Sequence, residues 1–328
     1  MNSAPPSRLR IAAIGFLNPA PLMWDFEHPP RMEELARRYQ IDRMTPSECA
    51  GRLATGAADV GLIPIAALAT TPGLRILPGC TIASKGRVRS LLLVRRAAQP
   101  LAKLRSVAAD SASRTTLAHA RILFRHWGNP DVPFLPATAD LDAMLERADA
   151  AILIGDPALL ALEERANRFE RSGVELVYHD LAAEWRALTG LPFVSAVWAS
   201  AAMNLGAPDP GSPRTGLRPW GGDPSHLGTW DSTINDFIHS RDQGLKNIDA
   251  LVAEWSTRIP IPEATIRAYL TTNIHYVLDE ECIEGMKAFF RMAAECGVLP
   301  EYCVSIGAQT GLSLTQYNCA NVQKSSRS

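Results

Sequence analysis

Short aliphatic segments that each run into a turn and then into a helix signal recur along this chain, and their order constrains its fold more than any other feature. One such segment covers residues 9–15, and the next covers residues 60–64. Between them, Thr45 is a typical helix N-cap with Pro46 just inside it, and Gly56 is expected to stop the helix. Strand, helix and strand in this order predict a parallel crossover unit and therefore an α/β fold.

The same order returns further along the chain. Residues 88–94 are strongly aliphatic and predict another strand, and residues 95–104 are typical of a connector. Two more strands, each followed by a loop and a helix, are predicted at residues 106–109 with 114–125 and at residues 150–156 with 157–165. We expect these segments to form a second parallel unit.

The last third of the chain has a different character. A buried strand is predicted at residues 193–198, and residues 204–230 are so rich in Gly, Pro, Ser and Asp that they indicate a long irregular loop. Helices are then expected over residues 235–255, 263–278 and 280–296. Residues 304–328 form a tail whose structure the pattern leaves uncertain.

The length of 328 residues exceeds one average domain and favours two compact lobes. We place the first lobe at residues 8–97 and 199–303, so that both chain ends build it, and the second lobe at residues 98–198. The sequence leaves the oligomeric state open.

Composition excludes several classes of partner. The 33 basic and 34 acidic residues give a formal charge of -1, so nucleic acid is not an expected partner. The six cysteines include no pair with zinc-type spacing, and we expect reduced thiols. We find neither a secretion signal nor a stretch long and apolar enough to cross a membrane, and we therefore expect a cytoplasmic protein.

Several separated motifs, in the same order along the chain, resemble those of the chorismate dehydratases. The resemblance extends roughly from Arg10 to Pro300, and the run from Asp180 to Val194, ending at Trp198, is its most specific part. The other motifs are Phe16-Leu17-Asn18 with Pro21-Leu22, Asp59 to Pro64, Ser84 to Ser90, Asp110 with Ser113-Arg114-Thr115, Ile154-Gly155-Asp156, Gly244-Leu245, Tyr269-Leu270 and Ile274-His275-Tyr276.

This resemblance implies a type II periplasmic-binding-protein-like fold, with two α/β lobes, mainly parallel sheets and a central cleft that traps the substrate. It also implies a carbon–oxygen lyase of the futalosine route to menaquinone, in which chorismate loses its ring hydroxyl as water and becomes 3-(1-carboxyvinyloxy)benzoate. Chorismate is then the small-molecule partner. Because the sequence has neither a Gly-rich phosphate loop nor a metal constellation, we expect no metal and no organic cofactor.

Chorismate carries two carboxylates, and donors at helix N-termini that follow strands suit such anions. Three groups of residues are candidates for substrate binding. They are Ser111, Ser113, Arg114 and Thr115 before and at the start of one helix, Ser84, Gly86 and Ser90 in the first lobe, and Gly155 and Asp156 at another strand exit. Structural roles remain open beside these: Ser113 is equally typical of a plain N-cap, Gly86 of a turn, and Asp156 of a helix cap.

Asn18 is the candidate catalytic residue at the exit of the first strand. Its amide is neutral and cannot act as a base, so either another residue removes the ring proton or the enolpyruvyl carboxylate of the substrate does. We favour the second, with Asn18 orienting the substrate and hydrogen-bonding the departing hydroxyl. The alternative is a turn residue before Pro19. His119 is expected to be a surface or packing histidine.

Two other functions stay open at this point. The first is a non-enzymatic receptor for a small carboxylate, because this fold serves binding more widely than catalysis. The second is the related dihydroxynaphthoate-forming enzyme of the same pathway, which is expected to use a histidine, although no histidine here occupies a matched motif.

Overall fold

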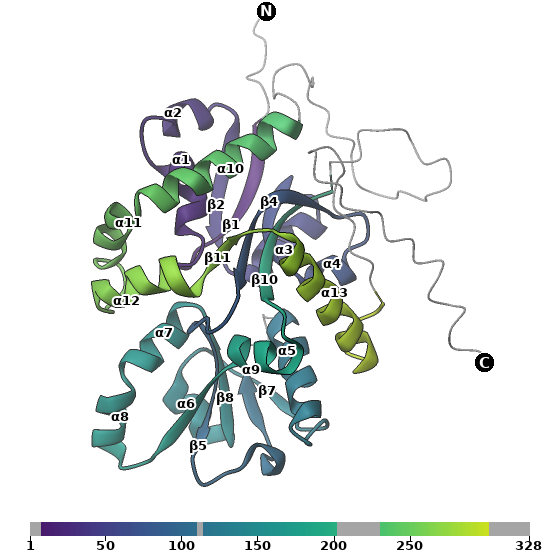
Figure 1. Ribbon diagram of the computed structural model, residues 1–328, viewed down its shortest axis with the longest axis vertical. Helices are drawn as coiled ribbons and strands as arrows, with labels where there is room; N and C mark the ends of the chain where they lie inside the picture. The colour runs from purple at the N-terminus through teal and green to yellow at the C-terminus, as the bar shows by residue number, and fades with distance from the viewer. Residues whose placement is uncertain (1–7, 110–113, 202–229, 302–328) are drawn as a thin grey trace, which may run out of the picture.

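The computed structural model describes residues 8–109, 114–201 and 230–301, and these residues form two β-sheets with helices on their faces (Figure 1). The irregular loop expected at residues 204–230 and the tail expected at 304–328 lie almost wholly outside the described residues. In Figure 1 the first sheet occupies the upper part of the molecule and the second sheet the lower part.

Six strands form the first sheet. Their order is β11 (His275–Val277), β4 (Arg75–Ser84), β10 (Phe193–Ser200), β3 (Val60–Pro64), β1 (Leu9–Ile14) and β2 (Tyr39–Met44). The helices of this part are η1 (Ala20–Met23), α1 (Trp24–Glu27), α2 (Met32–Leu35), α3 (Pro46–Ala54), α4 (Ala66–Thr70), α10 (Trp230–Lys246), α11 (Ile248–Trp255), α12 (Glu263–Ala268), the π-helical turn η4 (Tyr269–Asn273) and α13 (Glu280–Glu295).

Five strands form the second sheet. Their order is β7 (Phe134–Pro136), β6 (Val107–Ala109), β8 (Ala150–Ile154), β5 (Leu91–Arg96) and β9 (Leu176–Asp180). The helices of this part are η2 (Leu101–Lys103), α5 (Arg114–His126), α6 (Leu141–Arg147), α7 (Asp156–Glu163), α8 (Arg165–Ser172) and α9 (Leu181–Thr189).

The predicted crossover unit at the start of the chain is confirmed. β1 and β3 pair in parallel, and between them the chain forms β2, which pairs with the other edge of β1, and then α3, which leads into β3. α3 begins with a capping box in which the side chains of Thr45 and Glu48 each accept from the backbone N–H of the other. Every residue of β3 is buried, which explains its continuous aliphatic sequence.

The sheets are mixed, whereas mainly parallel sheets were expected. β10 pairs antiparallel with β3 and β4, and β5 pairs antiparallel with β8 and β9. Both β5 and β10 are the strands by which the chain enters or leaves a sheet after passing between the two. A strand that arrives from the other sheet has no crossover helix to set its direction, so an antiparallel pairing is open to it.

The chain passes between the sheets twice within its described residues. It leaves the first sheet at the end of β4, enters the second at the start of β5, and returns from α9 to β10. The predicted lobe limits, 97/98 and 198/199, come later in the chain than these passages, because the buried strands β5 and β10 carry no sequence mark of the sheet to which they belong.

One expected helix, residues 263–278, is only partly correct. The segment is helical from Glu263 to Asn273, but His275–Val277 is β11, which pairs with β4 and covers its edge. The need of β4 for an edge partner overrides the helical spacing of the apolar residues there.

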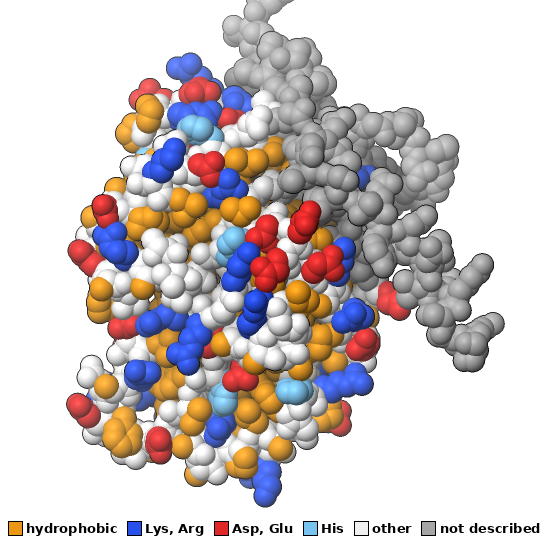
Figure 2. All heavy atoms as spheres, viewed as in Figure 1, with side chains coloured by type: hydrophobic (Ala, Val, Ile, Leu, Met, Phe, Trp, Pro, Cys, Tyr) orange, Lys and Arg blue, Asp and Glu red, His pale blue; other side chains and the backbone are white. Residues whose placement is uncertain are grey.

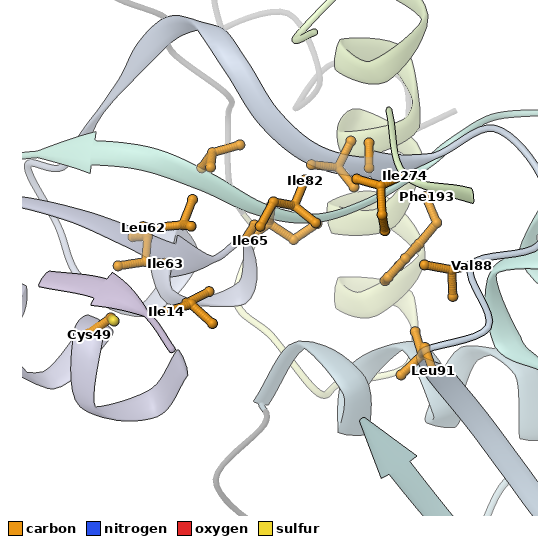
Figure 3. Packing of buried hydrophobic residues seen from close by; sticks show 14 of the residues in the cluster. Ile14, Cys49, Leu62, Ile63, Ile65, Ile82, Val88, Leu91, Phe193 and Ile274 are labelled. Carbon is orange, nitrogen blue, oxygen red and sulfur yellow. The ribbon is translucent and has the colours of Figure 1, made fainter. Parts of the chain in front are cut away.

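A single cluster of buried apolar side chains extends over both sheets. It includes Ile14 and Leu62 from the first sheet, Leu91 from the second, and Phe193 where the chain returns (Figure 3). A smaller cluster lies between the second sheet and α6. The shared core places the exits of strands from the two sheets close together.

Basic and acidic side chains are interspersed over the face that Figure 2 shows, in keeping with the formal charge of -1. Among the helices of the described segments, none has the length and apolar character needed to cross a membrane.

Candidate functional site

The exit loop of β1 meets the exit loop of β8, so that one strand end from each sheet contributes to the same place. The backbone N–H of Leu17 donates a hydrogen bond to Asp156 Oδ1 at 3.1 Å. Phe16 lies over Gly155, where a Cβ atom would come within 2.7 Å of the Phe16 ring and where φ is +63°. Only glycine satisfies both conditions, so Gly155 is explained by this close approach.

Asn18 lies between Leu17 and the start of η1. Its Oδ1 atom is buried and has no hydrogen-bond partner within the described part of the chain. Buried polar atoms are almost always hydrogen-bonded, so an unpaired amide oxygen at the junction of the two sheets is well suited to accept a hydrogen bond from a bound molecule. The structure thus groups three predicted residues, Asn18, Gly155 and Asp156.

Ser90 belongs to the same group. Its carbonyl accepts a hydrogen bond from the N–H of Gly155 at 2.8 Å, and its hydroxyl accepts one from Tyr269 OH at 2.7 Å. Tyr269 is fully buried, and burial raises its pKa. The tyrosine was absent from the predicted site, although it stands in one of the matched motifs, because its hydroxyl reaches Ser90 only through the tertiary fold.

Ser84 and Gly86 bond to each other. The Ser84 hydroxyl donates to the Gly86 carbonyl at 2.8 Å, and the Gly86 N–H donates back to the hydroxyl at 3.3 Å. This arrangement is the turn that remained open as an alternative for Gly86. Their contact with substrate stays a prediction.

Thr115 ties the second lobe to the exit of β3. The N–H of Ala66 donates to the Thr115 hydroxyl at 2.9 Å, in a buried position. Arg114 is the first residue of α5 and its side chain is outside the described part, while Ser111 and Ser113 lie outside the described residues altogether.

Asp180, the last residue of β9, organises the passage between β4 and β5. Its carboxylate accepts hydrogen bonds from the N–H groups of Val88 and Arg89 and caps α9 through Ala183 N–H. Burial raises the pKa of Asp180, and these three donors oppose that effect. The spacing of an aspartate before a helix is a sign of capping, but the two other contacts were not predictable from it.

Burial also raises the pKa of Asp156, to about 6, while the hydrogen bond from Leu17 N–H lowers it. A carboxyl group of this kind is mainly ionised at neutral pH and gains its proton just below it. Perturbed carboxyl groups gather at functional sites, which adds to the case for this junction.

One group of possible metal ligands is present among residues 8–109, 114–201 and 230–301. His275, Asp279 and Cys282 bring their ligand atoms within 4.8 Å of one another. However, Lys85 Nζ lies 2.8 Å from Asp279 Oδ2, and Asp279 Oδ1 caps α13 by accepting from Cys282 N–H. A fixed ammonium group at the shared carboxylate disfavours a cation there, so a capped helix with an ion pair accounts for the group.

His119 packs in the core, one of the two roles expected for it. Its ring is fully buried and stacks on Phe193 with centroids 3.9 Å apart, beside Trp185. Neither ring nitrogen has a partner in the described segments, and burial lowers the pKa of the imidazole to about 3.

His119→Phe is therefore expected to reduce the sensitivity of the fold to acid. Below the unfolded pKa of 6.5 the unfolded chain binds a proton that the folded imidazole rejects until about pH 3. The wild-type free energy of unfolding should consequently fall, relative to the variant, by up to about 1.4 kcal/mol for each pH unit below 6.5. Urea unfolding of both proteins between pH 7 and 4.5 measures this difference.

The control is His126→Phe, because His126 is exposed on the same helix. If His119→Phe followed the wild-type curve at every pH, the neutral buried imidazole would be the wrong description.

Three comparisons relate the chain to known proteins. A family model described as menaquinone biosynthesis matches residues 9–295. The chain is 27% identical over 262 residues to the chorismate dehydratase of Thermus thermophilus, a match that covers 76% of this chain and 85% of that protein.

Among solved structures, a protein from Archaeoglobus fulgidus has a TM-score of 0.61 at 14% identity, with 89% of this chain and 98% of that chain covered. The alkanesulfonate-binding protein of Xanthomonas axonopodis pv. citri, bound to MOPS, has a TM-score of 0.60 at 16% identity, with 91% and 96% covered. The periplasmic aliphatic sulphonate binding protein of Escherichia coli has a TM-score of 0.57 at 14% identity, with 97% and 99% covered. These similarities confirm the predicted periplasmic-binding-protein-like fold.

The family match spans both sheets and every strand exit described above. The matched residues include the junction formed by Asn18, Ser90 and Asp156. The chain therefore belongs to the menaquinone biosynthesis family.

Proposed function

We propose that the protein is a chorismate dehydratase, which converts chorismate to 3-(1-carboxyvinyloxy)benzoate and water. The observation that carries this proposal is the unpaired, buried amide oxygen of Asn18 at the meeting point of two strand exits. The similarity to the dehydratase of Thermus thermophilus and the ordered motifs around this junction support the same conclusion.

The reaction breaks one C–H bond and one C–O bond of the ring, and aromatisation provides the driving force. Asn18 has no basic atom, so its amide accepts from and donates to the ring hydroxyl and holds it in position to leave. The enolpyruvyl carboxylate of the substrate takes the adjacent ring proton. The hydroxyl departs as water by taking up the proton that the carboxylate has removed, so the C–H and C–O bonds give way to one O–H bond of water and the aromatic ring. Both carboxylates stay on the benzoate product.

The N-terminus of α5 suits a carboxylate of chorismate. Backbone N–H groups without intrahelical partners point out of a helix N-terminus, and the helix dipole favours an anion there. Arg114 is the first residue of α5 and is the basic residue that the sequence predicts for this anion.

Incubation of the purified protein with chorismate tests the proposal directly. A new aromatic benzoate product, separated by chromatography and identified by mass, is the expected result. Two rival functions give different results: a receptor for small carboxylates would bind chorismate without turnover, and the dihydroxynaphthoate-forming enzyme would act on the cyclic futalosine-derived substrate instead. The binding proteins among the structural relatives make the receptor the alternative to test first.

Turnover is expected to be unaffected by a chelator, because the roles assigned above use only amide, hydroxyl and guanidinium groups and the carboxylate of the substrate. Dialysis against EDTA followed by the chorismate assay measures this. Activity that disappeared on chelation and returned with one particular metal would contradict the proposed mechanism.

A further inference from the structure

The link between Asp156 and Leu17 connects the two sheets immediately beside Asn18. Asp156 is the first residue of α7 and follows β8 of the second sheet, whereas Leu17 follows β1 of the first sheet. The hydrogen bond from Leu17 N–H to Asp156 Oδ1, at 3.1 Å, therefore joins residues that are 139 positions apart in the chain.

Both ends of this link are anchored. The Leu17 side chain is fully buried, and Phe16 lies against Gly155. On the other side, the N–H of Gly155 donates to the Ser90 carbonyl at 2.8 Å, and the N–H of Ala158 donates to the Gly155 carbonyl at 3.1 Å. Asp156 thus projects from a rigid turn onto the backbone of the residue that precedes Asn18.

A direct contact between Asp156 and the substrate is less favourable than this link. Chorismate under the proposed function brings two carboxylates of its own, which the Asp156 carboxylate would repel. Its one hydroxyl, the group that could donate to Asp156, is already assigned to the Asn18 amide. The neighbouring Leu17 N–H, in contrast, is a donor in a buried position that would lose its partner without Asp156.

We propose that Asp156 is a positioning residue, which fixes the Asn18 amide through its hydrogen bond to Leu17 N–H and does not bind the substrate. This inference rests on the proposed function of Asn18 and replaces the substrate-binding role expected for Asp156. Under this proposal, the position of the Asn18 amide depends on the hydrogen bond that links the two sheets.

Two substitutions separate positioning from binding. Asp156→Asn keeps an acceptor oxygen for Leu17 N–H, whereas Asp156→Ala removes it. We expect Asp156→Ala to lower kcat at least tenfold with KM changed less than threefold, since misplacing a catalytic group by a fraction of an ångström slows the chemical step. Asp156→Asn should keep kcat within about threefold of wild type.

A double-mutant cycle tests whether Asp156 acts through Asn18. If it does, Asp156→Ala should have little further effect on kcat in a protein that already carries Asn18→Ala. Independent, multiplicative losses would overturn the proposal, as would a large rise in KM with kcat unchanged, or equal losses in the Asn and Ala variants.

Asp140→Ala is the matched control, because Asp140 likewise stands at the start of a helix of the second lobe, α6, and accepts from a backbone N–H group, that of Ala143, but this bond stays within the second lobe. It should leave kcat and KM unchanged. An effect on kcat as large as that of Asp156→Ala would mean that any lost carboxylate contact in the second lobe slows turnover, and it would overturn the proposed role.

Amide hydrogen exchange at Leu17, followed by NMR, provides a measurement that does not depend on turnover. The exchange should be at least tenfold faster in Asp156→Ala than in wild type or in Asp156→Asn. If wild-type protein left chorismate unchanged, the proposed function would fail while this measurement still tested the link. Equal Leu17 exchange in all three proteins would overturn the link itself.

Discussion

Gly244→Ala is expected to destabilise the protein by about 3 kcal/mol, since its new methyl group would overlap backbone atoms that have no side-chain freedom to move. Gly244 lies on α10, where an added Cβ would come within 2.1 Å of the carbonyl oxygen of Pro21 and 2.5 Å of its Cα. Relief requires α10 and η1 to separate. The midpoint of urea unfolding, compared with wild type, measures the loss.

Gly51→Ala is the control for this substitution. Gly51 also lies inside a helix, α3, but nothing is within 4 Å of the Cβ that it would gain. Replacing a helical glycine by alanine without a clash should stabilise the protein by about 0.5–1 kcal/mol. An unfolding midpoint for Gly244→Ala equal to that of wild type would mean that the close approach of α10 to Pro21 is not maintained in solution.

The same contact explains how α10 supports the candidate site. Pro21 comes three residues after Asn18, and Ser240 of α10 binds this region twice, by donating to the Leu22 carbonyl at 2.9 Å and accepting from Asp25 N–H at 3.0 Å. Two contacts therefore hold the segment around Asn18: α10 binds the residues that follow it, and Asp156 binds Leu17, which precedes it. A Gly244→Ala protein that still folds should therefore also lose turnover.

The sequence predicts strands that read as short apolar segments and misses strands that are polar or interrupted. β1, β3, β8 and β10 are mostly apolar segments, and each was expected close to its observed place. β2 was missed because it is a polar, half-buried edge strand. β4 was missed because Pro78 and Gly79 interrupt it, with Gly79 at φ +91°, and both residues normally end a strand.

The candidate site shows a similar division. A residue at the exit of a strand is visible in the sequence, so Asn18, Gly155 and Asp156 could be selected without a structure. Contacts that depend on which strand exits face each other were not visible. The roles of Asp180 at the passage between sheets and of Tyr269 against Ser90 arise from pairings of distant segments, for which spacing along the chain carries no signal.

Asn18→Ala is expected to reduce turnover by far more than it weakens substrate binding. If the amide mainly stabilises the departing hydroxyl, its loss removes one preorganised donor of the transition state, which costs about 2–4 kcal/mol, or roughly thirtyfold to a thousandfold in kcat. Steady-state kinetics with chorismate give kcat and KM separately, and KM should change only slightly.

The stability of the Asn18→Ala protein should be measured together with its kinetics, because the unpaired Asn18 Oδ1 atom predicts little change in stability. Because this atom has no protein partner among the described residues, removing it breaks no hydrogen bond of the fold, and Asn18→Ala should unfold at nearly the wild-type urea concentration. Asn129→Ala supplies the reverse case, since the Asn129 amide donates to the carbonyls of Leu101 and Leu104 at 3.1 and 2.9 Å. It should lose stability and keep turnover.

If Asn18→Ala kept full turnover, Asn18 would be a turn residue before Pro19, and the orientation of the substrate would have to come from other side chains at the junction of the two sheets.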